Sequence, residues 1–152
     1  MGVELLNHPG PAWPERIVDV ATPTVMKVVQ LTPGLPLFDA LVEAVKSTGY
    51  EYGAADYFGG FLEPLAYCVP GDGNEQQAVT FSEPRLRERV EIVTAASVIG
   101  VRHGGPYVHT HASWLTTDGE LRAGHLFPES IVGSPAPWAV VSGMPGVHWE
   151  SD

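Results

Sequence analysis

Cysteine is nearly absent from this chain, which has a single one, Cys68, among its 152 residues. One thiol cannot form a disulfide within the chain, and no Cys-x-x-Cys pair is present to indicate a zinc finger or a redox motif. Cys68 lies within the apolar segment Leu65-Ala66-Tyr67-Cys68-Val69. The sequence therefore predicts a buried, unreactive thiol in a fold that depends on its hydrophobic core.

Long apolar runs are also missing. No stretch approaches the roughly 18 residues that a transmembrane helix needs, and the N-terminus lacks the basic and apolar segments of a signal peptide. We therefore expect a soluble cytoplasmic protein. At 152 residues the chain has the usual length of one domain, which is long enough to bury a sizeable core.

Positive charge is scarce. Eight Lys and Arg residues stand against eighteen Asp and Glu residues, and the net charge is −10. Such a balance repels a phosphate backbone unless the cations gather on one face. The one local gathering, Arg85-x-Arg87-x-Arg89, has Glu83, Glu88 and Glu91 interleaved with it, which favours a solvated charged segment over a nucleic-acid surface.

One segment has the pattern of an α-helix. Leu37, Phe38, Leu41, Val42 and Val45 recur at helical spacing and form one apolar stripe. Proline suits the first helical position, where its missing N–H costs nothing, and residue 36 is a proline. A lysine at 46 suits the C-terminal end of the helix dipole, and glycine 49 can supply a left-handed cap. We expect a helix over residues 36–48.

Most of the remaining chain has the pattern of short strands. Residues 25–31 are apolar and β-branched, and further apolar runs separated by turn signals follow glycine 49. The clearest turns are 70–74 and 117–119. We expect an irregular arm over 1–24 and one domain over 25–152, with an α+β fold in which a mostly antiparallel sheet packs against one main helix. The predicted strands after the helix are 50–58, 64–69, 77–81, 90–102, 107–116, 120–127 and 137–143.

Three histidines carry the main chemical signal. His109 and His111 are two residues apart in a predicted strand, so their side chains point to the same face about 7 Å apart. His125 lies in the next predicted strand. Whether it joins the pair depends on the intervening turn.

Two registers of the hairpin are open. If Asp118-Gly119 forms a two-residue turn, residue 112 lies opposite His125, which then faces away from the other two histidines. If Thr117-Asp118-Gly119 forms a three-residue loop with glycine in the left-handed position, His111 faces His125 directly. The two Cβ atoms would then be about 5 Å apart.

Three imidazoles with an open fourth position are typical of a catalytic zinc site, because a structural site closes that position with protein. Nickel, copper and iron also bind nitrogen ligands. The sequence therefore predicts a divalent metal, with zinc preferred, held by His109, His111 and His125. The alternative is a set of hydrogen-bonded histidines at a sheet surface or subunit interface.

The chain resembles the PPC domain, the plants-and-prokaryotes conserved domain, in its bacterial and archaeal form. The resemblance covers about residues 25–144 and rests on Pro33-Gly34 before the helix, His109-Thr110-His111, Asp118-Gly119 and Gly124-His125-Leu126. It implies an α+β domain that assembles as a homotrimer, with the three histidines forming a zinc site near the subunit boundary. Bacterial members are often labelled DNA-binding because plant relatives carry AT-hook segments, but this chain has no Arg-Gly-Arg-Pro hook.

The sequence departs from the family pattern in places. It has Ala123-Gly124 where the family often has Gly-Gly, Leu35 where an acidic residue often follows Pro-Gly, and no Glu near residues 138–140. Cupins also share a His-x-His strand, but they expect a Glu where this chain has Leu115 and Thr116. Acetolactate decarboxylases are similar to the PPC domain in fold and use a three-histidine zinc, which makes a lyase or hydrolase the natural enzymatic hypothesis.

The sequence is therefore compatible with four functions. The first is a metal-dependent oligomeric binding module, of a regulatory kind, in which a small ligand completes the metal's coordination. The second is a zinc enzyme acting on a small carbonyl or carboxylate compound, with Arg102, Arg122, Glu129 and Asp118 as candidate acid, base or anion-binding groups. The third is a DNA-associated protein, and the fourth a trimeric structural protein without metal.

Overall fold

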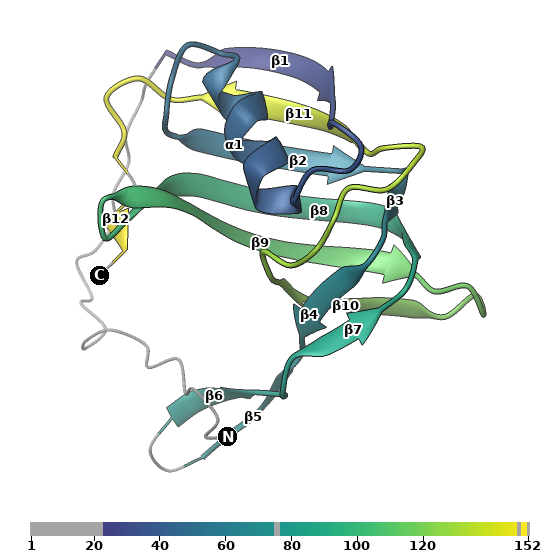
Figure 1. The fold of residues 1–152 in the computed structure, drawn as a ribbon. Helices are drawn as coiled ribbons and strands as arrows, with labels where there is room; N and C mark the ends of the chain where they lie inside the picture. The colour runs from purple at the N-terminus through teal and green to yellow at the C-terminus, as the bar shows by residue number, and fades with distance from the viewer. Residues whose placement is uncertain (1–22, 75–76, 149, 152) are drawn as a thin grey trace.

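The computed structural model of the chain describes residues 23–74, 77–148 and 150–151 (Figure 1). The arm predicted for residues 1–24 lies outside the described residues, apart from its last two. Ten strands form one large sheet, a separate hairpin forms a small second sheet, and one α-helix is present in the described part of the chain. The predicted α+β class is confirmed, because the sheets are antiparallel except where β12 joins β8.

The large sheet has the strand order β1-β11-β2-β8-β9-β10-β4-β7, and both β3 and β12 pair with β8 outside that path. The hairpin β5-β6 projects from the body of the domain (Figure 1). The bounds of the strands are β1 Val25–Gln30, β2 Gly53–Phe58, β3 Phe61–Leu62, β4 Leu65–Cys68, β5 Pro70–Asn74, β6 Gln77–Phe81, β7 Arg85–Arg87, β8 Val90–Arg102, β9 Gly105–Leu115, β10 Leu121–Leu126, β11 Trp138–Gly143 and β12 Glu150–Ser151.

The helix α1 spans Leu37–Lys46 and lies across one face of the sheet (Figure 1). Pro36 is not its first residue, as the sequence suggests, but its N-cap, because its ψ of 136° is extended rather than helical. Gly49 ends the helical segment as predicted, with a φ of +93° and an N–H that donates to the carbonyl of Lys46. The helix buries an apolar stripe consisting of Leu37, Ala40, Leu41, Ala44 and Val45.

Residues 70–74, predicted as a turn, form strand β5 instead. Gly71 is extended and pairs with Thr80, whose Oγ1 would lie 2.9 Å from a Cβ at position 71. The Thr80 hydroxyl donates to the carbonyl of Asp72 at 2.7 Å. Glycine at this position permits close contact between two strands. Sequence alone cannot distinguish such a glycine from one in a turn.

The charged segment around Arg85 is exposed as predicted, but it also forms the edge strand β7. The Arg89 guanidinium forms an ion pair with Glu63 and lies 3.9 Å above the ring of Phe61. This arginine is therefore engaged within the chain. The sequence did not predict this strand, because three residues with one leucine between two arginines are too short to show an alternating pattern.

The two faces of the large sheet differ. Tyr57, Ala139 and Val141 point toward α1 and are fully buried, whereas their neighbours Asp56 and Trp138 are exposed on the opposite side. We call the side opposite α1 the open face. The paired strands place these residues on it: Met26, Val28, Gln30, Ala54, Asp56, Phe58, Thr94, Ala96, Val98, His109, His111, Ser113, Ala123, His125, Trp138, Val140 and Ser142.

A buried polar network lies beneath the open face. The hydroxyl of Thr110 on β9 is hydrogen-bonded to that of Tyr57 at 2.9 Å, and Ser97 donates to Thr110 at 2.7 Å. Burial raises the pKa of the Tyr57 phenol far above its usual range. These bonds join β2, β8 and β9, so they fix the middle strands relative to one another. No helix in the described residues is long and apolar enough to cross a membrane.

Candidate metal centre

The loop between β9 and β10 sets the register that the sequence left open. The N–H of Thr116 donates to the carbonyl of Glu120 at 3.0 Å, and the N–H of Gly119 donates back to Thr116 at 2.9 Å. Gly119 has a φ of +82°, the left-handed conformation that glycine adopts readily. The three-residue loop is therefore the correct alternative, and His111 pairs directly with His125.

The three predicted histidines meet on the open face. The ring centroids of His109 and His111 are 4.9 Å apart, those of His109 and His125 4.9 Å, and those of His111 and His125 5.2 Å. One ring nitrogen from each side chain lies within 4.8 Å of the others. Two adjacent strands thus bring together residues that are up to 16 positions apart in the sequence.

Residues on the other side of the same strands hold this cluster in place. Thr110, between His109 and His111, is fully buried in the polar network that includes Tyr57. Gly124, next to His125, lies against strand β4, and a Cβ at this position would be only 2.4 Å from the carbonyl oxygen of Cys68. The backbone of β10 can approach β4 this closely only because residue 124 is glycine.

The imidazoles have no hydrogen-bond partner within the described part of the chain. The ring of His125 has an aromatic neighbour instead, Phe127, in an edge-to-face contact at 5.5 Å. No hydrogen bond within the described residues therefore holds the three rings in place. One nitrogen of each ring is available to a ligand that all three can share.

The charged forms of two of the rings are disfavoured. Partial burial, and then the neighbouring His109 and His111, lower the pKa of His125 to about 4. Burial, and then His111, also lower the pKa of His109. Neutral imidazole is the form that binds metals, so these two shifts favour the metal-binding form of His109 and His125.

The donor set fits a divalent metal. Imidazole nitrogens bind zinc at about 2.0–2.1 Å, so two nitrogens on one ion are at most about 4 Å apart. The observed span of 4.8 Å is slightly larger. Small rotations of the side chains would close it, and they are feasible because two of the rings, those of His109 and His111, are exposed.

The lowered pKa of His125 predicts how the stability of the metal-free protein depends on pH. Between pH 6.5, the ordinary value, and about 4, the unfolded chain takes up a proton at this residue and the folded chain does not. Stability should therefore fall as pH falls through this range and should not change above it on account of this group. In His125→Asn this contribution disappears. Thermal unfolding with a chelator present, from pH 7 to 4, should give a shallower decline for the variant; parallel curves would contradict the prediction.

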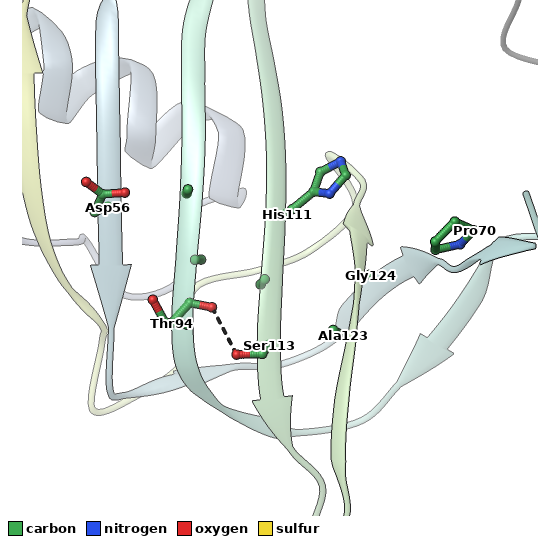
Figure 2. A pocket seen from close by; sticks show the side chains of 10 residues that line it. Asp56, Pro70, Thr94, His111, Ser113, Ala123 and Gly124 are labelled. Atoms are coloured by element: carbon green, nitrogen blue, oxygen red, sulfur yellow. Dashed lines mark hydrogen bonds between the residues drawn. The ribbon is translucent and has the colours of Figure 1, made fainter. Parts of the chain in front are cut away.

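A pocket of about 440 Å³ opens beside the cluster (Figure 2). His111 forms part of its lining, and Asp56 on β2 is the carboxylate within it. Asp56 was not among the candidates selected from the sequence, and it precedes His111 by 55 positions. The full lining consists of Asp56, Pro70, Thr94, Ala95, Ala96, His111, Ala112, Ser113, Ala123 and Gly124.

None of the four acid, base or anion-binding candidates from the sequence lines this pocket. Arg122 pairs with Glu120, and Asp118 accepts a hydrogen bond from Thr116 in the β9–β10 loop. Arg102 lies 5.5 Å above the ring of Tyr107 at the far end of the β8–β9 hairpin. Glu129 lies in the loop after β10 and is also outside the lining.

Comparison with known proteins finds a matching protein family and several solved structures of similar fold. The profile of the Plants and Prokaryotes Conserved (PCC) domain matches residues 20–142. A plant- and prokaryote-conserved protein of Pyrococcus horikoshii is similar, with 17% identity, a TM-score of 0.65, and coverage of 88% of this chain and 89% of that chain. A metal-containing protein of Archaeoglobus fulgidus has 20% identity and a TM-score of 0.66, with 89% of each chain covered.

A candidate DNA-binding protein of Ralstonia eutropha JMP134 is also similar, with 14% identity, a TM-score of 0.60, and coverage of 82% of this chain and 80% of that chain. At such low identity these likenesses show the fold alone. None of the curated proteins compared with the chain matches it.

Proposed function

Because the chain belongs to the Plants and Prokaryotes Conserved domain family, we propose that it is a metal-dependent, oligomeric binding module in which His109, His111 and His125 hold a divalent metal. A small ligand completes the coordination. The observation that carries this proposal is the convergence of three ring nitrogens within 4.8 Å of one another. The metal-containing protein of Archaeoglobus fulgidus, which has a similar fold, supports it.

Zinc is the preferred ion, since three neutral imidazoles with a free position are its usual donor set in open sites. Nickel, copper and iron accept the same nitrogen donors. When bound, such an ion supplies a Lewis acid for a ligand oxygen. The part of the histidines is to keep their nitrogens on one side of the sheet.

Metal content tests the proposal directly. The full chain, purified without a polyhistidine tag, offered zinc and then dialysed, should retain about one metal per chain by elemental mass spectrometry. Copper and nickel offered in parallel establish which ion is preferred. Zinc content near zero after dialysis, with no other ion retained, would refute the metal site and leave a metal-free interaction module.

The open face supports self-association. Near one edge of the sheet, Met26 is 63% exposed, Val28 66%, Phe58 47% and Trp138 48%. These side chains belong to three adjacent strands, β1, β11 and β2, and form a contiguous apolar surface. A surface of this kind is typical of a protein interface. We therefore propose a homo-oligomer, with a trimer as the specific expectation.

Solution mass tests the assembly. Light scattering on the eluting protein should give about three times the mass of the 16.3 kDa chain. Replacing Trp138 with Lys should shift the protein toward the monomer, because it places a charge in the apolar surface. The exposed Lys46→Glu exchange on α1, on the other side of the sheet, is the control. A monomeric native protein would contradict the proposal.

A zinc-dependent lyase or hydrolase acting on a small carbonyl or carboxylate compound is the second candidate. The specific observation in its favour is a carboxylate, Asp56, in the same pocket as His111. Turnover of a keto acid by the zinc-loaded protein, absent after chelation, would support it. A DNA-binding role has less support, because the net charge is −10 and Arg89 is paired with Glu63.

A further inference from the structure

Four residues form a straight row across the open face. Asp56 on β2 pairs with Ala96 on β8, and Ala96 pairs with His111 on β9. His111 in turn pairs with His125 on β10. Directly paired residues of adjacent strands carry their side chains on the same face. The carboxylate of Asp56 and the three-histidine cluster therefore stand on one surface, with a single alanine between them.

The side chains between Asp56 and the histidine cluster are small, and they leave a pocket there. Ala96 lies at the centre, and Ala123 and Gly124 continue the lining across β10. On one side Thr94 and Ser113 provide hydroxyl groups, and the Ser113 hydroxyl donates to the carbonyl of Thr94 at 3.5 Å (Figure 2). A larger side chain at position 96 would fill this space.

The charged groups that line the pocket indicate which kind of ligand it would bind. Asp56 is the one carboxylate of the lining, and no Lys or Arg lines the pocket. The Asp56 carboxylate has no ion pair or hydrogen bond among residues 23–74, 77–148 and 150–151. A ligand with two anionic ends would place one of them against this carboxylate. A ligand with a cationic end would give it a partner.

The separation of Asp56 and His111 indicates how long the ligand would be. Asp56 and His111 are two strands apart, which is roughly 10 Å at the backbone. A metal–oxygen bond takes about 2 Å of this and a charge-assisted hydrogen bond about 2.8 Å. The His111 ring is turned toward β10, away from Asp56, so at least roughly 5 Å remains between the two charged groups of the ligand (Figure 2). This needs an unbranched chain of about five or more carbons.

We propose that this pocket binds a short ω-amino carboxylate, with Asp56 accepting hydrogen bonds from its ammonium group and its carboxylate binding the metal held by the three histidines. This inference rests on the proposed metal site. It adds to that site a specificity-determining residue and a substrate class, and it excludes phosphates and dicarboxylates.

A matched set of compounds tests the inference on the zinc-loaded full chain. Calorimetric titration should show that 5-aminopentanoate binds at least about tenfold more tightly than pentanoate, which lacks the amine, or glutarate, which has a second carboxylate. The Asp56→Asn variant should lose this preference and bind 5-aminopentanoate and pentanoate within about twofold of each other. The exposed Asp39→Asn variant on α1 is the control and should bind as the native protein does.

The outcomes separate this inference from the proposed function. Metal content is measured first on every sample. Full zinc content with equal binding of the three compounds, or with none bound, would overturn the inference and leave the metal site intact. A change of oligomeric state in Asp56→Asn, with the amine preference absent from the native protein, would also overturn it and assign Asp56 to a subunit contact. Zinc content near zero in the native protein refutes both.

Discussion

Replacing His111 and His125 together with alanine is expected to reduce the bound metal from about one per chain to nearly none and to lower the melting temperature by several degrees. One remaining imidazole, His109, cannot hold an ion in competition with water. Metal that binds only the folded chain at about a hundred times its Kd contributes about 2.7 kcal/mol. For a chain of this length that corresponds to roughly 5–10 °C.

Elemental mass spectrometry and thermal unfolding, with and without added zinc, measure both effects. The control is His103→Asn, which removes a histidine outside the cluster; asparagine suits its φ of 51°. The decisive comparison is the zinc-dependent part of the melting temperature. If the double variant keeps its metal, or if zinc stabilises it as much as the native protein, the ion is bound elsewhere.

Adding one methyl group at Gly124 is expected to damage both the fold and the site. In Gly124→Ala the new Cβ would lie 2.4 Å from the carbonyl oxygen of Cys68 and 3.3 Å from the ring of Trp114. Because the first of these contacts is with backbone, β10 must move away from β4. We expect a loss of about 1–3 kcal/mol of unfolding free energy, as for other overpacked sites.

The displaced strand carries His125, so zinc affinity should fall at least about tenfold as well, since ligand geometry governs metal binding. Denaturant unfolding and zinc competition titrations test the two effects. Gly105→Ala on β9 adds the same methyl group where its Cβ would meet only the carbonyl oxygen of Arg102, at 3.8 Å, and it serves as the control. Native stability and affinity in Gly124→Ala would mean that β4 accommodates the methyl group.

The three-histidine cluster was largely predictable from the sequence. Alternation along a strand places His109 and His111 on one face whatever the rest of the fold is. His125 was not determined in this way, because Asp118-Gly119 suits both a two-residue turn and the end of a three-residue loop. The left-handed φ of Gly119 and the pairing of Thr116 with Glu120 decide between them.

Asp56 could not be found by the same reasoning. It becomes a neighbour of His111 only through two successive strand pairings, β2 with β8 and β8 with β9. No local pattern determines which strands are adjacent when 55 positions separate the residues. The one signal was a single acidic residue at an outward position between apolar neighbours in residues 53–58.

The fold class followed from one clear helical stripe among short strands, but individual strands depended on tertiary contacts. Residues 70–74 contain two glycines and a proline and have the composition of a turn, yet they are extended because β6 supplies their backbone partners. Strand β7 likewise exists because β4 offers a free edge. Partners distant in sequence outweighed local propensity at both places.

Successive side chains of strand β9 alternate between the buried core and the open face. Val108, Thr110, Ala112 and Trp114 face the core, while His109, His111 and Ser113 face outward and carry little of the folding energy. Mutations on the outward side can therefore accumulate over evolution at small cost to folding. Solved structures that are 14% to 20% identical to this chain share its fold. The same independence makes the open face a surface on which new metal sites can be engineered.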